Sequence, residues 1–249
     1  MNENTGTLIG LGVGPGDPEL ITLKAIHILQ KAQVLAVPAK VPDNSTAFQI
    51  AKEAVPEISE KTIMGLDFPM TRDQNAVDRA MSGNEERLRA VLDHGSDVVF
   101  LTLGDPTIYS AFYRIAPMLQ RRGYPIKTVS GITSFCAVAS ATGIPLVTGN
   151  EVLTVYPKIP DKLTIGEGTA IFMKPGSRIG RLKEQLIQME KEQNVMVMGA
   201  VNCGLENQKV FFRAEEISET AGLSLQVLIA IFMSQVFTLL SPRKVGIAL

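Results

Sequence analysis

The sequence contains no tryptophan, and it has only two histidines and two cysteines among its 249 residues. Its charges nearly balance, with 24 Lys and Arg against 25 Asp and Glu, and no block of basic residues stands out. Proteins that bind nucleic acid need clustered Lys and Arg for the phosphates and aromatic side chains for the bases, so this composition argues against a nucleic-acid partner. Cys136 and Cys203 share no metal-binding or redox spacing, and we expect them to pack as small apolar side chains.

The two ends of the chain differ in their apolar content. The first ten residues have neither the basic region nor the long apolar core of a secretory signal peptide, which favours a cytoplasmic protein. Residues 221–240 carry no charge and approach the length of a membrane span. Gln226, Ser234 and Gln235 would lie inside such a span, so we favour a buried strand, LSLQVLIAIF, over a membrane anchor. The role of the apolar tail 230–249 stays open.

Short apolar runs alternate along the chain with segments whose apolar residues recur at helical spacing. This alternation predicts an α/β fold with mostly parallel sheets. The expected strands are 7–11, 34–38, 97–103, 124–130, 152–156, 169–174, 195–201, 209–214 and 223–232. The expected helices are 18–32, 45–55, 72–95, 106–123, 132–143 and 178–193. We place a boundary near Gly123–Pro125, which gives an N-terminal α/β domain of residues 1–123 and a C-terminal α/β domain of residues 124–249.

The glycine-rich stretch GLGVGPGD follows the first expected strand and matches neither familiar phosphate-binding loop. No Lys precedes Lys24, and the third glycine of a dinucleotide fingerprint would fall on Pro15 or Asp17. Glycine beside small polar residues follows other expected strands as well, at 104–110, 130–134, 174–176 and 202–204. Ligands of open α/β sheets bind beyond the carboxyl ends of the strands, so these loops predict a binding cleft for something other than a pyrophosphate.

The same loops contain few groups that could act as a base or a nucleophile. His27 and His94 lie in or at the end of expected helices, and the sequence has no Gly-x-Ser-x-Gly elbow, no Cys/His pairing and no metal-spaced cluster. We therefore expect a reaction whose driving force comes from an activated cofactor, with the protein supplying the positions of the reactants.

Four segments in order, GVGPGDPELITLKA, LTLGDPTIYS, SGITSFCAVASATGIPL and TAIFMKPG, resemble the tetrapyrrole (corrin and porphyrin) methyltransferases over roughly residues 5–215. The resemblance implies two α/β domains with S-adenosylmethionine in the cleft between them, a tetrapyrrole substrate and a homodimer. The segments VPAK, STAFQIA, FPMTRD and LGDPTIYSAF are most similar to the enzymes that methylate carbon 20 of precorrin-2 or cobalt-factor II in cobalamin (vitamin B12) biosynthesis.

The resemblance also implies roles for individual residues. The positions that match the cofactor-binding residues are Gly14, Pro15, Gly104, Asp105, Ile108, Thr133, Ser134, Met173, Ala200 and Val201. Tyr109 is a candidate catalytic residue, as an orienting hydroxyl. Basic residues of expected loops that could hold the substrate carboxylates are Lys40, Arg72, Lys158, Lys174 and Arg178. Alternatives stay open: Asp105 could be a turn residue before Pro106, Met173 plain core, Tyr109 a packed helix residue, and each cation a solvated surface charge.

The chain departs from the family pattern near its end. Relatives usually close on a short strand near YFSL, where this sequence has GLSLQVLIA, and Ser130 stands where Pro is common. Three other interpretations of the function remain: a methyltransferase that acts on another position of the corrin ring, a noncatalytic tetrapyrrole-binding protein, and a dinucleotide-dependent oxidoreductase. The absence of the dinucleotide fingerprint disfavours the last of these. The same fold also serves a ribosomal RNA methyltransferase and diphthine synthase, and FPMTRD disfavours both.

Overall fold

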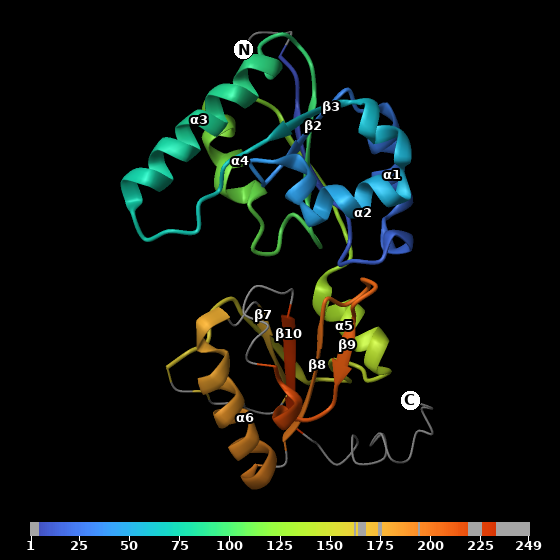
Figure 1. The fold of residues 1–249 in the computed structure, drawn as a ribbon, viewed down its shortest axis with the longest axis vertical. Helices are drawn as coiled ribbons and strands as arrows, with labels where there is room; N and C mark the ends of the chain where they lie inside the picture. Colours follow the sequence, from blue (N-terminus) through green and yellow to red (C-terminus); the bar gives the residue numbers. More distant parts are fainter. Residues whose placement is uncertain are drawn as a thin grey trace. The chain divides into compact units, whose positions relative to one another are not determined.

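The computed structural model describes residues 5–161, 163, 168–173, 176–193, 195–218 and 226–232. The chain divides into two compact units, Met1–Thr133 and Ser134–Leu249, each with its own sheet and helices (Figure 1). The α/β class predicted from the alternating pattern is therefore confirmed.

The first unit is built on a five-stranded sheet in which every described strand pairing is parallel. The strand order is β3-β2-β4-β1-β5. The strands are β1 (Leu8–Gly12), β2 (Val34–Val37), β3 (Thr62–Gly65), β4 (Val98–Thr102) and β5 (Ile126–Val129). The sequence does not predict β3, because it is a four-residue edge strand, TIMG, with only its last residue buried. Parallel pairing places the loops that follow all these strands at one edge of the sheet.

Helices cover both faces of this sheet. Figure 1 shows α1 (Leu23–Lys31) and α2 (Thr46–Ala54) on one side, and α3 (Gln74–Leu92) and α4 (Phe112–Arg121) on the other. Three of these helices begin at a capping side chain, in each case an oxygen of Thr22, Ser45 or Asp73 that accepts a backbone N–H. Buried residues of α3 and α4 pack with those of β1 and β4 to form one side of the core.

The boundary between the units and two of the helices differ from the expected ones. The boundary lies after Thr133 instead of near Gly123, because β5 pairs with β1 from Leu8↔Ile126 to Leu11↔Val129 and so belongs to the first sheet. The segment expected as one helix at 18–32 is divided into a 3-10 turn, Pro18–Leu20, and α1. The helix expected from 106 begins only at Phe112.

The second unit has a five-stranded mixed sheet of order β6-β7-β10-β8-β9. Its strands are β6 (Val152–Tyr156), β7 (Gly168–Met173), β8 (Val195–Val201), β9 (Lys209–Phe211) and β10 (Gln226–Phe232). Among the described strands of this unit, only β6 and β7 pair in parallel, and the three other pairings are antiparallel. Five of the eight described strand pairings in the two sheets are thus parallel, as expected. The three antiparallel pairings lie in the second unit, where β10 is inserted between β7 and β8 and β9 pairs with β8.

Two helices accompany the second sheet, α5 (Ser134–Thr142) and α6 (Ile179–Glu192), and Figure 1 shows them on opposite sides. Buried residues of α6, Leu182, Leu186 and Met189, pack with Phe172 and Val197. In the segment expected to be either core or a membrane anchor, residues 226–232 form the central strand β10. No described helix is long and apolar enough to cross a membrane, and residues 233–249 of the tail lie outside the described part of the chain.

Candidate cofactor and substrate site

The loops after β1, β4 and β5 meet at the carboxyl edge of the first sheet, because these three strands are neighbours and run in parallel. Gly14 and Gly104 form an isolated antiparallel bridge across two of the loops. In this bridge the Gly104 N–H donates to the Gly14 carbonyl oxygen at 2.7 Å. Both glycines have positive φ, 80° and 71°, which a residue with a side chain adopts at a cost.

Glycine is required where the loops touch. A Cβ on Gly131 would lie 2.9 Å from the Gly12 Cα atom and closer still to the Gly104 carbonyl oxygen. A Cβ on Gly12 would lie 2.8 Å from the Gly131 Cα atom. Carbon atoms in contact are about 3.5–4.0 Å apart, so a side chain at either position would push the loops apart. The sequence shows glycines at the ends of strands but does not show that these three meet.

Asp105 joins the loop after β4 to the loop after β5. One carboxylate oxygen accepts the Thr107 N–H at 2.8 Å and the Thr107 hydroxyl at 2.5 Å. The other oxygen accepts the Gly131 N–H at 2.9 Å, and Asp105 is only 8% exposed. The side chain is thus used to hold the protein's own backbone, which is the turn role that the sequence left open.

Two features of these loops leave room for a ligand contact, the open surroundings of Gly104 and the hydroxyl of Thr133. The Cβ position of Gly104 has one neighbouring atom within 4 Å, the Ile132 carbonyl oxygen at 3.8 Å. The Thr133 hydroxyl is buried and has no hydrogen-bond partner among the described residues. Residues 12–17, 103–110 and 130–134 contain no Lys or Arg. Loops that offer backbone groups and a hydroxyl but contain no Lys or Arg fit a ligand that has no phosphate.

Three further positions expected to bind the cofactor belong to the same loops or follow them directly in the chain. Pro15 is buried between Gly14 and Gly16, and Ile108 is partly exposed in the loop after β4. Ser134 is the first residue of α5 and belongs to the second unit. The expected positions Gly14, Gly104 and Thr133 are therefore brought together at one sheet edge, and Ser134 follows them directly in the chain.

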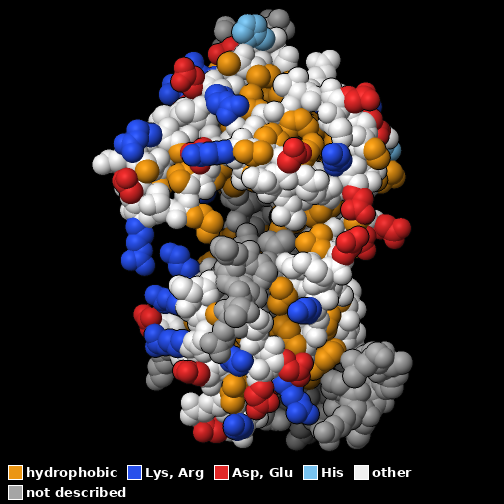
Figure 2. Space-filling view, in the orientation of Figure 1, with side chains coloured by type: hydrophobic (Ala, Val, Ile, Leu, Met, Phe, Trp, Pro, Cys, Tyr) orange, Lys and Arg blue, Asp and Glu red, His pale blue; other side chains and the backbone are white. Residues whose placement is uncertain are grey.

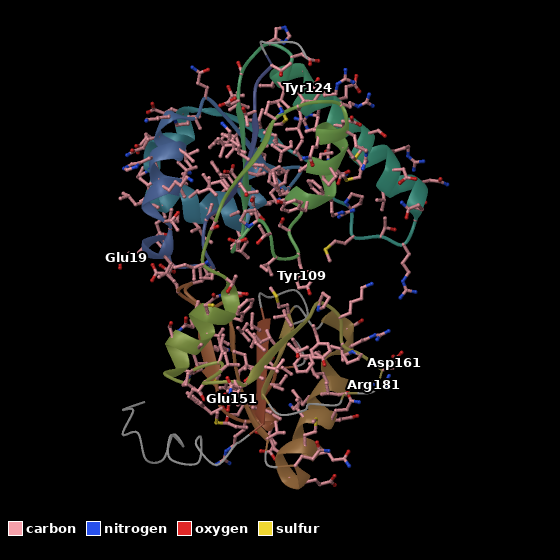
Figure 3. All side chains as sticks on the ribbon, turned by 180° about the vertical axis from the view of Figure 1, so that it is seen from behind. Glu19, Tyr109, Tyr124, Glu151, Asp161 and Arg181 are labelled. Atoms are coloured by element: carbon pink, nitrogen blue, oxygen red, sulfur yellow. The ribbon has the colours of Figure 1, made fainter. Side chains whose placement is uncertain are left out.

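Tyr109 lies in the loop after β4, on the strand-end side of the first unit, and Tyr124 lies at the opposite end of that unit (Figure 3). The Tyr109 φ is 47°, and the residue is 57% exposed. A positive φ is unusual for an aromatic residue and is often found at functional sites. The expected helical environment of Tyr109 is not observed, since α4 begins three residues later.

The residues of the second unit that are expected to contact the cofactor lie on neighbouring strands of its sheet. Val227 of β10 pairs with Met173 at the end of β7 and with Ala200 near the end of β8. Met173 is partly exposed, whereas Ala200 and Val201 are buried. Cys203 follows β8, and burial raises the pKa of its thiol, so it is a poor nucleophile at neutral pH.

The expected substrate cations fall into two groups. Lys40 and Arg72 are exposed and follow β2 and β3 at the carboxyl edge of the first sheet. The Lys40 ammonium lies 3.0 Å from a carboxylate oxygen of Asp67, a residue that the sequence analysis does not single out. The visible face of the first unit carries basic and acidic side chains intermixed with apolar ones (Figure 2).

The second group belongs to the second unit. Lys158 is exposed after β6, and Lys174 lies outside the described residues. Arg178 donates to the Ile159 carbonyl oxygen at 3.0 Å and lies 3.4 Å from Asp161. Asp161 also pairs with Arg181 near the start of α6 (Figure 3). Arg178 therefore holds the protein's own chain, and its assignment to substrate stays a proposal.

Comparison with known proteins gives one family. The model of the Tetrapyrrole (Corrin/Porphyrin) Methylases matches residues 7–218. A protein of Methanocaldococcus jannaschii named probable cobalt-precorrin-2 C(20)-methyltransferase is 34% identical over 84% of this chain and 88% of its own length. Precorrin-2 C(20)-methyltransferase of a Sinorhizobium species is 31% identical over 73% of this chain and 78% of its own.

A solved structure gives the same fold. Uroporphyrin-III C-methyltransferase of Thermus thermophilus, in complex with S-adenosylhomocysteine, superimposes with a TM-score of 0.61 at 21% identity. The superposition covers 91% of this chain and 97% of the other.

Proposed function

Because this chain belongs to the tetrapyrrole (corrin/porphyrin) methylases, we propose that it is an S-adenosylmethionine-dependent methyltransferase that acts on carbon 20 of precorrin-2 or of its cobalt-containing counterpart in cobalamin biosynthesis. The observation that carries the acceptor position is the similarity, over more than 70% of the chain, to two relatives named for that carbon. The geometry of the loops at the carboxyl edge of the first sheet supports the assignment of S-adenosylmethionine as the cofactor.

The residues present fit this cofactor. S-adenosylmethionine supplies a methyl group activated by a positively charged sulfur, and it has no phosphate. The open surroundings of Gly104 and the Thr133 hydroxyl, which has no hydrogen-bond partner among the described residues, offer room and a polar contact in loops that contain no Lys or Arg. Gly14 and Pro15, which are buried, and the partly exposed Ile108 are proposed as further contacts from the adjoining loops. In the second unit, Met173, Ala200 and Val201 are proposed as apolar contacts for the cofactor, with Ser134 as a further hydroxyl.

The chain's own part in catalysis is to orient the reactants and to exclude water. We assign Tyr109, held in its loop at positive φ, to orienting the macrocycle through its hydroxyl. Lys40 and Arg72 bind carboxylates of the substrate from the first unit. Lys158, Lys174 and Arg178 are the corresponding proposals for the second unit.

Isothermal titration with S-adenosylhomocysteine, and then with NAD as the control, tests the cofactor. Micromolar binding of the first and none of the second is expected, and the reverse result would favour an oxidoreductase. Incubation with a ¹³C-methyl donor and precorrin-2 or cobalt-precorrin-2, followed by NMR, then locates the new methyl group. A methyl on another carbon would indicate a different corrin methyltransferase, and macrocycle binding without cofactor binding would indicate a carrier.

We further propose that the protein forms a homodimer and is located in the cytoplasm. The edge strand β6 exposes Val152 and Leu153, at 61% and 36%, and exposed strand edges are surfaces for association. Cys136 and Cys203 are unpaired, as is common in reducing compartments. Light scattering should give twice the chain mass, and cell fractionation should recover the protein with cytoplasmic markers.

A further inference from the structure

Asn84 is a buried polar residue in the middle of the long helix α3. It is 3% exposed, and Asn is a weaker helix former than Leu or Ala. A buried amide is unfavourable unless its groups are hydrogen-bonded, so the partners of Asn84 indicate why it occupies this position.

Both ends of the Asn84 amide bind the backbone of one loop residue. The Asn84 Oδ1 atom accepts the Asp67 N–H at 2.9 Å, and the Asn84 Nδ2 atom donates to the Asp67 carbonyl oxygen at 2.6 Å. Asp67 lies 17 residues away in sequence, in the loop between β3 and α3. This two-way pairing fixes the backbone of Asp67 against the helix.

The neighbouring residue Gly65 is held as well. Arg87, also on α3, donates to the Gly65 carbonyl oxygen. A Cβ on Gly65 would lie 2.6 Å from the Ala39 carbonyl oxygen, so the backbones after β2 and β3 are in close contact. The end of β3 is therefore attached to α3 on one side and to the Lys40 loop on the other.

The side chain of Asp67 extends this arrangement to Lys40. Its carboxylate oxygen lies 3.0 Å from the Lys40 ammonium, whose side chain is 72% exposed. An ammonium has three N–H donors, so one ion pair with Asp67 leaves donors for a ligand. Lys40 follows β2 at the sheet edge where the candidate site lies.

We propose that Asn84 is a positioning residue for the tetrapyrrole: it fixes Asp67, which in turn holds the Lys40 ammonium where it binds a carboxylate of the substrate. This inference rests on the proposed function. It adds a residue that touches neither reactant and acts on substrate affinity, with no effect on the cofactor.

The test is a double-mutant cycle with Asn84→Ala, Lys40→Met and the combined variant, and Asn75→Ala as the matched control. Asn75 is an exposed asparagine in the first turn of the same helix. Each single substitution should raise the KM for the tetrapyrrole about tenfold, as expected for a lost hydrogen bond to a charged group. The combined variant should also show about a tenfold rise, because both changes remove the same contact, whereas independent effects would multiply to about a hundredfold.

Three measurements separate the outcomes. The affinity for S-adenosylhomocysteine and kcat should stay within about twofold of wild type in all variants. Asn75→Ala should leave the KM for the tetrapyrrole and the KM for S-adenosylmethionine unchanged. If Asn84→Ala does not fold, the Lys40→Met variant alone still tests the inference. An unchanged KM for the tetrapyrrole in that surface variant would overturn it. A hundredfold effect in the combined variant, or equal losses in cofactor affinity, would also overturn it. Absence of methyl transfer by the wild type would instead refute the proposed function.

Discussion

Replacement of Gly131 by alanine tests how closely the three loops of the candidate site pack. The new Cβ would lie 2.1 Å from the Gly104 carbonyl oxygen and 2.9 Å from the Gly12 Cα atom, and both distances are well below van der Waals contact. The loops must therefore separate by about 1 Å. Overpacking of this kind costs about 1–3 kcal/mol, and the lower entropy of the unfolded alanine chain offsets about 0.4–1 kcal/mol. We expect a net loss of about 1–2 kcal/mol in the free energy of unfolding.

The same displacement alters the surface offered to the cofactor. The Gly131 N–H holds Asp105 at 2.9 Å, so a shift of this loop also moves the loop after β4. We expect the affinity for S-adenosylhomocysteine to fall about tenfold, which corresponds to about 1.4 kcal/mol. Urea denaturation gives the stability, and isothermal titration gives the affinity.

Gly83→Ala is the matched control for this experiment. Gly83 lies within α3, and its Cβ position has no atom within 4 Å. An alanine there should stabilise the protein by about 0.5–1 kcal/mol, because glycine is unfavourable inside a helix. The reasoning would be refuted if Gly131→Ala matched Gly83→Ala in stability and kept wild-type affinity for S-adenosylhomocysteine.

Three further predictions follow from single contacts. Asp105→Asn replaces one accepting oxygen by an N–H donor, which would face the N–H of either Gly131 or Thr107, and should cost about 1–3 kcal/mol in urea denaturation; a change below about 0.5 kcal/mol would contradict this. Burial raises the pKa of the Glu190 carboxyl above 4.5, so protonation favours the folded state. The stability of wild type relative to Glu190→Gln should therefore be highest below pH 4.5 and fall as pH rises through the raised pKa, and a pH-independent difference would refute it. Cys136 is exposed and Cys203 is buried with a raised thiol pKa, so a thiol reagent should label one cysteine quickly and the other slowly, and two equal rates would be incompatible with the fold.

Local patterns in the sequence predict much of the fold. Alternating strands and helices indicate the α/β class, and every described strand except β3 overlaps an expected run. The helix expected at 45–55 starts at Ser45, whose hydroxyl accepts the Phe48 N–H at 3.3 Å. The helix expected at 72–95 is followed by Gly95, which has a φ of 77°. These features depend on residues within a few positions of one another, so one sequence suffices to read them.

The candidate site is predicted only in part. The glycines after β1 and β4 are visible as loop signals, and the resemblance to the family points to Gly104 and Thr133. The role of Asp105 depends on Gly131, 26 residues further along the chain. A continuous helix from 106 is interrupted by Tyr109, whose φ of 47° lies outside the α-helical region. Asp67 and Asn84 carry no motif at all, because their relation exists only across the packed loop and helix.

The sequence by itself determined the alternation of strands and helices, the positions of caps and glycine turns, and the absence of phosphate-loop and nucleophile motifs. Only the tertiary structure decided that β5 joins the first sheet, that β10 lies antiparallel between β7 and β8, and that Lys40, Asp67 and Asn84 are linked. The physical reason is that side-chain periodicity records which face of an element is buried. It contains no record of which distant strand, backbone amide or charge completes the contact.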